Sequence, residues 1–332
     1  MSTHARRRPR AALALLAALP VVALLAACSG ASAAAGDSDL QAAADAAGLQ
    51  VNTTPEQDRI HTAENPAAVK LLPAEFAAKD TFKVAVSAGG APPLTFLADD
   101  EKTPIGNETD IAQLVADALG KKLELEVKAW ADWPLAVQSG DVDAVITNVT
   151  VTEERKELYD FSSYRNDQLG WLVKAGGDIT KIDEPKDIAG LTVAVGSGTN
   201  QEKILLAWDK QNTDAGLEPV KVEYFENDAD TILALQSGRI DASFGPNASA
   251  AYKARVSPKD FAVVGTLNGG WPNTAQIAVT TLKGNGLVDA VTVALQGAFD
   301  DGSYQKVLQR WGLEAEAIAK PETNPPGLPK TE

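Results

Sequence analysis

The stretch LAVQSGDVDAVITN, residues 135–148, is nearly repeated as LALQSGRIDASFGPN, residues 233–247. In both copies an apolar helical pattern stops at Ser-Gly, a turn follows, and an apolar strand pattern begins. Gly140 and Gly238 are predicted to be left-handed helix ends, because glycine tolerates that backbone conformation. The repeat therefore predicts two similar lobes. The residues that diverge after each strand are expected to face what lies between the lobes.

Strand and helix patterns alternate on both sides of each copy, which predicts an α/β fold with mostly parallel sheets and helices on both faces. Asp143 and Asp241 follow the two turns and are predicted to accept bonds from nearby backbone amides. In open α/β sheets, ligands sit beyond the carboxyl ends of strands. Here those ends are expected to be TNVTVTEER (147–155), GPNASAAY (245–252) and GSGTNQE (196–202).

Residues 1–28 have the features of an export signal. A basic start, ARRRPR, precedes an apolar stretch that is interrupted by Pro20 and too short for a comfortable membrane span. The stretch ends in LAAC, which resembles a bacterial lipobox and predicts a lipidated Cys28 as the first mature residue. The alternative is an ordinary signal cleaved nearby, with Cys28 incidental. The sequence leaves the export route open.

The charge of the chain argues against nucleic acid. The formal net charge is −15, and without the four arginines of residues 1–27 it is −19, from 26 basic and 45 acidic residues. Nucleic-acid binding depends on phosphate neutralisation by Lys and Arg, and a polybasic membrane contact needs a cluster of them. We therefore expect no nucleic-acid partner, and contact with the membrane through the lipid anchor only.

The scarcity of cysteine and histidine limits the chemistry of the chain. Cys28 is the single cysteine, which excludes internal disulfides and a cysteine-based metal site. Outside the signal the only histidine is His61, in a segment of low complexity. We therefore expect no catalytic residues, no metal and no cofactor.

WPLAVQSGDVDAVITNVTVTEERKELYDFSSY, residues 133–164, resembles the signature region of the family 3 bacterial extracellular solute-binding proteins. These proteins are amino-acid receptors of ABC importers. PPLTF, PIGNETDIAQLVADALG and LTVAVGSGTNQE follow the family's order and spacing, from about Phe82 to Gly312. The resemblance implies a two-lobe periplasmic-binding-protein-like fold (type II), with two hinge crossovers and closure on the ligand.

The resemblance also implies the organisation and function of the chain. We expect a lipid-anchored, extracytoplasmic, monomeric receptor that hands a small carboxylate-bearing, amino-acid-like solute to the permease subunits of an ABC importer. The alternatives are an extracytoplasmic dehydratase resembling cyclohexadienyl dehydratase and a solute sensor module. The expected segments are the signal at 1–28, a tether and extension at 29–80, lobe 1 at 82–173, lobe 2 at 174–273, a return to lobe 1 with C-terminal helices at 274–316, and a disordered tail at 317–332.

Arg155 is the first candidate ligand residue. The arginine at this place in the family binds the α-carboxylate of the ligand, and its planar fork gives two parallel bonds to such a group. Arg155 is also expected to open a helix with Thr152 as N-cap, so that the helix start adds free amides. The alternative is a surface ion pair with Glu153, Glu154 or another neighbouring acid.

Small polar residues are further candidates in both lobes. The family places such residues around the carboxylate and ammonium of the ligand, at the positions of Thr147, Asn148 and Thr150. Their alternative is bonding to the local backbone. Thr199 and Asn200 offer donors from the other lobe, although Thr199 and Glu202 also have the spacing of a capping box.

Two tryptophans are candidate walls of the ligand site. Trp133 matches a family position where an aromatic ring packs on the side chain of the ligand, and its alternative is core packing of a short helix. Trp271 precedes the expected return strand and is a weaker candidate. Two indoles at a cleft would suit an apolar, aromatic or cationic group.

The chain departs from the family pattern at the ammonium end of the site. Pro246, followed by the candidate Asn247, stands where members usually carry an aspartate for the α-ammonium, and Ala91 replaces a common aromatic. Either another acid takes the role or the ligand is not a standard α-amino acid. The acids considered for this role are Glu108, Asp99 and Asp230.

Overall fold

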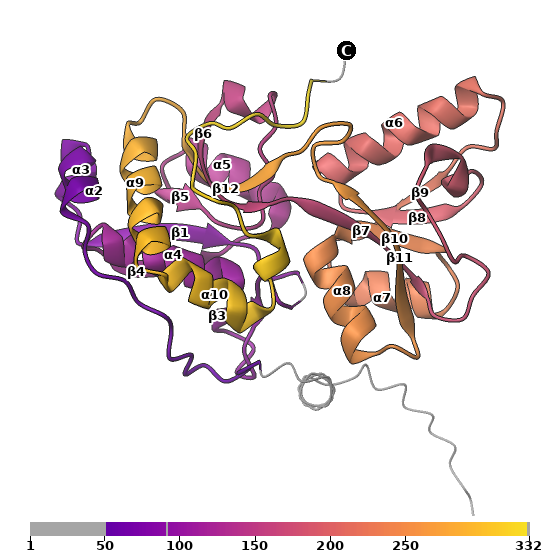
Figure 1. Ribbon diagram of the computed structural model, residues 1–332, viewed down its shortest axis with the longest axis horizontal. Coiled ribbons are helices and arrows are strands. Elements are labelled where there is room, and N and C mark those ends of the chain that lie inside the picture. Colours follow the sequence, from indigo (N-terminus) through magenta and orange to yellow (C-terminus); the bar gives the residue numbers. More distant parts are fainter. Residues whose placement is uncertain (1–50, 91, 331–332) are drawn as a thin grey trace, which may run out of the picture. The chain divides into compact units, whose positions relative to one another are not determined.

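Two five-stranded sheets organise the chain (Figure 1). The computed structural model describes residues 51–90 and 92–330, all within one unit, Asp37–Glu332. The first sheet has the order β4 (Lys122–Val127), β1 (Thr81–Val86), β5 (Ala144–Val145), β12 (Gln276–Leu282) and β6 (Tyr159–Asn166). The second has the order β11 (Phe261–Asn268), β7 (Gln168–Lys174), β10 (Ala242–Pro246), β8 (Thr192–Val195) and β9 (Lys221–Tyr224).

The two sheets share one pairing pattern. In each sheet two neighbouring strand pairs are parallel, β4–β1–β5 and β9–β8–β10, and the other two pairs are antiparallel. The expectation of mostly parallel sheets is therefore wrong, because the strands that link the lobes run back against their neighbours. Between β6 and β7, and between β11 and β12, the chain crosses from one sheet to the other. The two-lobe fold with two crossovers is confirmed.

Helices cover both faces of each sheet, as Figure 1 shows. The side chains of Val84 and Val86 face the cluster formed with α4, α9 and α10, whereas Ala85 faces α5 on the other side. In lobe 2, Val193 and Val195 pack on the α6 side. The helices are α2 (Pro66–Leu71), α3 (Ala74–Ala77), α4 (Asn107–Ala118), α5 (Trp133–Gln138), α6 (Asn200–Asp214), α7 (Asp228–Gln236), α8 (Asn247–Val256), α9 (Leu287–Asp300) and α10 (Ser303–Trp311).

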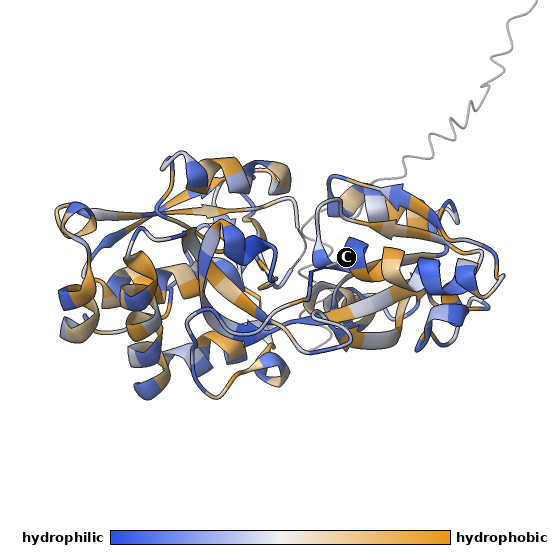
Figure 2. Cartoon of the chain, turned by 90° about the horizontal axis from the view of Figure 1, so that it is seen from above, coloured by the Kyte–Doolittle hydropathy of each residue, from blue (hydrophilic) through white to orange (hydrophobic). Residues whose placement is uncertain are grey.

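Short elements complete the described residues. They are the strands β2 (Phe96–Leu97) and β3 (Pro104–Ile105) and the 3-10 turns η1 (Trp130–Asp132), η2 (Arg155–Glu157), η3 (Pro185–Ile188) and η4 (Glu314–Glu316). Figure 2 shows hydrophobic residues concentrated on the strands, while the helices mix hydrophobic and hydrophilic residues along their length. No helix of the described residues has the length and apolar content to span a membrane.

The repeated phrase has the predicted structural cause. Gly140 and Gly238 end α5 and α7 with φ angles of 72° and 73°. Asp143 Oδ2 accepts a bond of 2.9 Å from the amide of Lys83 on β1, and Asp241 Oδ2 accepts one of 2.7 Å from the amide of Thr192 on β8. The two phrases therefore build the same helix-to-strand corner, once in each lobe.

Residues before and after the two lobes pack on them. Residues 51–80 pack on lobe 1, where the side chain of Asn65 caps α2 and the guanidinium of Arg59 pairs with Asp110. The tail was predicted to be disordered, but as far as residue 330 it packs on the protein and runs along β6. Backbone bridges join Thr323 to Ser162 and Leu328 to Thr152. Predictions about the signal, Cys28, residues 29–50, Ala91 and residues 331–332 lie outside the described residues.

Candidate functional site

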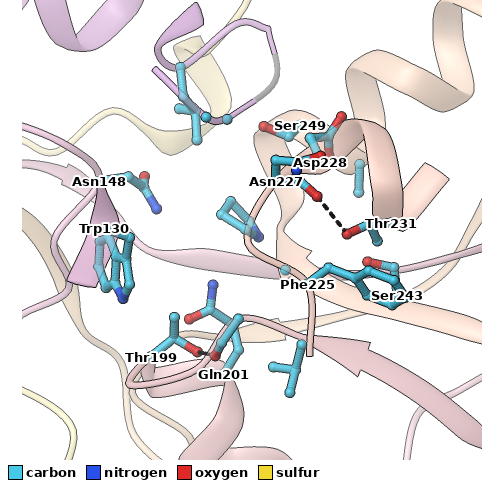
Figure 3. Close-up of a pocket in the computed structure, with 18 of the residues that line it drawn as sticks. Trp130, Asn148, Thr199, Gln201, Phe225, Asn227, Asp228, Thr231, Ser243 and Ser249 are labelled. Atoms are coloured by element: carbon cyan, nitrogen blue, oxygen red, sulfur yellow. Dashed lines mark hydrogen bonds between the residues drawn. The ribbon is translucent and has the colours of Figure 1, made fainter. Parts of the chain in front are cut away.

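A pocket of about 250 Å³ is lined by residues of both lobes (Figure 3). Its walls are the segments that follow strands: Thr147 and Asn148 after β5, residues 196–201 around the end of β8, and residues 225–228 after β9. The end of β10 and the start of α8 form another wall. Because the carboxyl ends of these strands meet here, the pocket lies where ligands bind in open α/β sheets.

Of the three small polar residues predicted in lobe 1, two line the pocket and one does not. Thr147 and Asn148 line the pocket. Thr147 Oγ1 accepts a bond of 2.9 Å from the amide of Ser87, and the amide of Asn148 donates to Glu108 Oε2 at 3.1 Å. Thr150 is buried and lies outside the lining. The backbone of Asn148 is left-handed, with φ of 56°, which turns the chain at the pocket edge.

Thr199 and Asn200 line the pocket from lobe 2. Thr199 is the N-cap of α6, and its Oγ1 accepts the amide of Glu202 at 3.1 Å. The return bond of a capping box is shifted, because Glu202 Oε2 accepts the amide of Gly198 at 2.7 Å. Thr199 therefore caps the helix and also borders the pocket.

Asn200 and Thr150 meet at a buried carboxylate. Asp167 Oδ2 lies 2.7 Å from Thr150 Oγ1 and 2.9 Å from Asn200 Nδ2, which also donates to the carbonyl of Gly269. Thr150 Oγ1 is 2.9 Å from Asn200 Oδ1 as well. Burial raises the pKa of Asp167 to about 6, although the bond from Thr150 acts in the opposite direction. This cluster joins the two lobes beside the pocket.

Arg155 lies behind one pocket wall. Its guanidinium donates to the carbonyl of Thr150 at 2.9 Å and to the carbonyl of Gly198 in lobe 2 at 3.1 Å. The guanidinium carbon is 5.5 Å from the ring centroid of Trp130, which lines the pocket, and 5.8 Å from that of Trp133. Burial lowers the pKa of Arg155 to about 10, so the group is charged at neutral pH.

The surface ion pair considered for Arg155 is not formed. Glu153 pairs with Lys156 at 2.8 Å, and Glu154 pairs with Lys203. No carboxylate of the described residues lies within ion-pair distance of Arg155. The expected helix after Thr152 is a single 3-10 turn, η2, although Thr152 Oγ1 does accept the amide of Arg155 at 3.0 Å. The turn is too short to supply a helix dipole.

The aromatic wall of the pocket differs from the predicted one. Trp133 is 4% exposed and packs in the core against Tyr159, with 5.0 Å between ring centroids. Its neighbour Trp130 lines the pocket instead, opposite Phe225 (Figure 3). Trp271 packs on Trp208 in the lobe 2 core, outside the lining.

The acids of the pocket come from both lobes. Glu108 lines the pocket from α4, Glu226 lines it from the loop after β9, and Asp228 lines it from the first position of α7. Pro246 also lines the pocket. Asp99 and Asp230 are exposed and lie outside the lining, as the partly buried Asn247 also does. Glu226 and Asp228 could have been predicted from the sequence, because they follow a strand of the parallel part of the second sheet.

Behind the pocket, Glu108 belongs to a buried charge network. Arg165 donates to Glu108 Oε1 at 3.0 Å, to Asn148 Oδ1 and to Glu316, while the hydroxyl of Tyr164 donates to Glu108. Burial disfavours the charged form of Arg165, but the Glu316 and Glu108 carboxylates outweigh it and raise its pKa. Glu108 is therefore held by protein partners on the side away from the pocket.

The pocket combines neutral polar groups with aromatic rings and a few charges. Hydroxyls and carboxamides at strand ends can bind a polar head group, and the rings of Trp130 and Phe225 can cover an apolar part. Among the described residues no cluster of three or more metal-ligating side chains occurs. The arrangement therefore fits the binding of a small organic molecule.

Residues 82–314 match the family described as bacterial extracellular solute-binding proteins, family 3. The chain is 32% identical over 225 residues to the L-cystine-binding protein TcyJ of Escherichia coli K12, covering 67% of this chain and 79% of that one. It is 29% identical over 224 residues to the arginine-binding protein ArgT of Corynebacterium glutamicum, covering 67% and 71% of the two chains.

Solved structures of amino-acid-binding proteins have the same fold. An ancestral arginine-binding protein bound to arginine superposes with a TM-score of 0.62 at 32% identity, over 70% of this chain and 98% of that chain. The ancestral amino-acid-binding protein AncCDT-1, a precursor of cyclohexadienyl dehydratase, superposes with a TM-score of 0.61 at 27% identity, over 71% and 97% of the two chains.

Proposed function

The chain belongs to the family 3 bacterial extracellular solute-binding proteins, and we propose that it binds a small amino-acid-like solute that carries a carboxylate and delivers it to the permease of an ABC importer. Relatives named for binding L-cystine, arginine and glutamine support an amino-acid ligand. The pocket supports it further, since strand-end hydroxyls and amides of both lobes line one cavity.

The proposal that the solute has a carboxylate rests on the charge of Arg155. Its guanidinium is charged, partly buried and bonded to two backbone carbonyls. The carboxylate of Asp167 acts on it electrostatically, but no carboxylate of the described residues lies within ion-pair distance. A partly buried cation is stabilised by an anionic partner with forked geometry. We propose that the carboxylate of the solute is that partner, and that it takes the place of the Gly198 carbonyl at Nη2.

A contact of this kind is large enough to matter. A hydrogen bond to a charged group contributes ~1.5–3 kcal/mol, and micromolar binding needs about −8 kcal/mol in total. Thr147, Asn148, Thr199 and Asn200 are proposed to bind the rest of the head group, and Trp130 to cover the apolar part. Thr150 acts in this proposal through Asn200, to which it is bonded.

Closure on the ligand is proposed to couple the two lobes. Contacts already cross the pocket rim, from Arg155 to the Gly198 carbonyl at 3.1 Å and from the amide of Asp228 to the carbonyl of Gly89 at 3.3 Å. A solute that touches both walls favours the closed state by its differential contacts with the two states. The closed form is what the permease is proposed to recognise.

The protein is proposed to act as a monomer outside the cytoplasm, held to the membrane by a lipid on Cys28. The support is the sequence LAAC at the end of an apolar stretch that follows a basic start. Metabolic labelling of the expressed full chain with a radioactive fatty acid is expected to mark the wild type and leave Cys28→Ala unlabelled. Equal labelling of the two would overturn the anchor.

The first test of the function is to identify the bound solute. The full chain is expressed and purified in detergent, and small molecules released by denaturation are analysed by mass spectrometry. Arg155→Ala is purified in parallel, with Lys156→Ala as the neighbouring control. We expect a carboxylate-bearing compound on the wild type and the control, and a loss of about tenfold or more in occupancy on Arg155→Ala.

The other outcomes are informative in different ways. Equal occupancy on Arg155→Ala would show that the carboxylate is bound elsewhere or is absent. A compound that the protein converts on prolonged incubation would replace the receptor by an enzyme. Unchanged recovery of the compound after incubation is the result expected for a receptor.

A further inference from the structure

The charged side chains of the pocket are few and unevenly placed. Among the described residues that line it, Lys253 is the one Lys or Arg, and the acids are Glu108, Glu226 and Asp228. Glu108 is occupied by Arg165, Tyr164 and the amide of Asn148. The charged groups left facing the cavity therefore come from lobe 2.

Asp228 and Lys253 form a pair of opposite charges in that wall. Asp228 Oδ1 lies 2.7 Å from Lys253 Nζ, and the two side chains are 33% and 13% exposed. Asp228 is the first residue of α7, where a carboxylate is favoured by the helix dipole. Lys253 lies on α8 seven residues after Pro246, and with Ser249 and Ala250 these residues form one helix face toward the cavity.

This pair has capacity for further partners. An ammonium group has three donors and a carboxylate has about four acceptor positions, so one contact between them leaves both able to bind other groups. A pair that is only partly buried and opens on a cavity can bind the ammonium and the carboxylate of a zwitterion together. Asp228 would receive the ammonium, and Lys253 the carboxylate.

The pair lies across the pocket from Arg155. Figure 3 shows Trp130 on one side of the pocket and Asp228 on the opposite side. The guanidinium carbon of Arg155 lies 5.5 Å from the ring centroid of Trp130. Apolar and aromatic residues, Leu94, Leu172, Val195, Phe225 and Phe244, also line the pocket. The pocket thus combines one pair of opposite charges in its lobe 2 wall with apolar lining residues, and Arg155 lies next to Trp130 in the opposite wall.

We propose that Asp228 and Lys253 form a second head-group site, and that the solute is an amino acid with an ammonium and a carboxylate at its far end as well. This inference rests on the proposed function, which supplies the first head group at Arg155. It identifies the solute class as bipolar amino acids, with two zwitterionic ends joined by a short, largely apolar spacer.

A purely structural role is the alternative. The pair also joins the start of α7 to α8, and an ion pair can serve only to hold two helices together. The two roles differ in one respect. A structural pair affects every ligand equally when it is removed, whereas a recognition pair affects only those ligands that carry the matching charged group.

The test is a thermodynamic cycle between side chains and ligand groups, measured by isothermal titration calorimetry on the full chain after removal of bound solute. The probes are 2,6-diaminopimelate and L-cystine, which have two head groups. L-Lysine lacks the second carboxylate of diaminopimelate, L-2-aminopimelate lacks the second ammonium, and L-norleucine lacks both. The variants are Asp228→Asn and Lys253→Met.

The expected result is selective. The wild type should bind at least one two-headed probe about ten- to a hundredfold more tightly than L-norleucine. Asp228→Asn should abolish the advantage of diaminopimelate over aminopimelate, and Lys253→Met its advantage over lysine. The control is the exposed pair Lys210 and Asp214 on α6, whose variants Lys210→Met and Asp214→Asn should leave every affinity unchanged.

Several results would overturn the inference. One is an equal loss of affinity for every probe in Asp228→Asn and Lys253→Met, which is the signature of a structural pair. Another is wild-type binding of L-norleucine as tight as that of the two-headed probes, which leaves the proposed function standing. If no probe binds, the bipolar class is wrong, and the solute found by mass spectrometry decides the proposed function by itself.

Discussion

Two neighbouring tryptophans show how one residue's surroundings decide its role. Trp130 and Trp133 are three residues apart, and their rings contact each other edge to face with 6.1 Å between centroids. Trp133 points into the lobe 1 core, where Ala136, Val137 and Tyr159 surround it. Trp130 is partly exposed, lines the pocket and covers the guanidinium of Arg155. The same side chain therefore stabilises the fold at one position and is placed to meet a ligand at the other.

Alanine substitutions should separate these roles. Trp133→Ala is expected to lower the free energy of unfolding by ~3–5 kcal/mol, because it leaves a large core cavity. Trp130→Ala should change stability much less but weaken solute binding, because the aromatic wall and the cover of Arg155 are lost. Urea denaturation and calorimetric titration measure the two effects. A Trp130→Ala variant with wild-type affinity would remove this indole from the site.

The sequence predicted an aromatic residue at this wall and selected Trp133, whereas the structure places Trp130 in the pocket lining. Trp133 lies on a short amphipathic helix, and the core alternative was visible from that pattern. Trp130 precedes the helix in a 3-10 turn, a setting with no periodicity to indicate which way a side chain points. For Arg155 the sequence predicted a ligand contact, and in the structure one of its partners is the carbonyl of Gly198 in the other lobe. Such a contact depends on how the lobes meet.

At the scale of elements, the two crossovers are tied together at Asp167. Its backbone amide donates to the carbonyl of Ala275 at 3.0 Å, and its carbonyl accepts the amide of Gly269 at 3.0 Å. Its side chain accepts from Thr150 in lobe 1 and from Asn200 at the start of α6. A side chain at position 269 would clash with this carboxylate, so the glycine is required by the close approach of the two segments.

The raised pKa of Asp167, about 6 against an ordinary 3.8, predicts a dependence of stability on pH. Because the folded-state pKa lies above the unfolded one, folding takes up a proton between about pH 4 and 6. The contribution of Asp167 to the free energy of unfolding is therefore highest below pH 4 and falls as pH rises through this window. The fall amounts to up to about 3 kcal/mol for a shift of this size.

Asp167→Asn isolates this contribution. The unfolding free energy of the wild type minus that of the variant should be larger at pH 4.5 than at pH 7.5, in urea denaturation at both values. Asp214→Asn, on the exposed face of α6, controls for the loss of a carboxylate. A difference that stays constant with pH would mean that Asp167 titrates normally in the folded protein.

Elements with a clear hydrophobic periodicity or turn signal were predictable from the sequence. Elements stabilised by partners far away in the sequence were not. The corner after α5 and the corner after α7 follow from Gly140, Gly238 and the aspartates that succeed them. Strand β6 reads YDFSSYRN and is almost wholly buried. Its Arg165 is neutralised by Glu316, and its Ser163 accepts the amide of Glu322. Those partners lie about 150 residues away in the sequence, so no local sequence pattern predicts them.

At the scale of the whole molecule, the C-terminal segment links the lobes a third time. It leaves α10 in lobe 1, runs along β6, and exchanges backbone bonds with lobe 1 through Leu328, whose amide donates to Val151 at 3.0 Å and whose carbonyl accepts the amide of Glu153 at 2.9 Å. The side chain of Leu328 is 5% exposed and packs in the lobe 2 core cluster, with Trp271 nearby. Leu328 therefore binds lobe 1 through its backbone and lobe 2 through its side chain. Four prolines in residues 320–332 made the segment read as disordered, because the sequence does not show which groove receives it.

The C-terminal segment is therefore expected to raise the free energy of unfolding, although its proline-rich composition is typical of a disordered tail. Leu328→Ala should lower the free energy of unfolding by ~2–5 kcal/mol, the range for truncating a buried leucine, because the cluster loses a side chain that it surrounds. Leu158→Ala, at an exposed leucine of lobe 1, is the matched control and should cost far less. Deletion of residues 320–332 should destabilise the protein at least as much as Leu328→Ala, since it also removes the backbone bonds to Val151 and Glu153. Urea denaturation followed by far-UV circular dichroism measures all three. If the deletion were as stable as the wild type, the segment would be a passive tail, and the two crossovers alone would hold the lobes together.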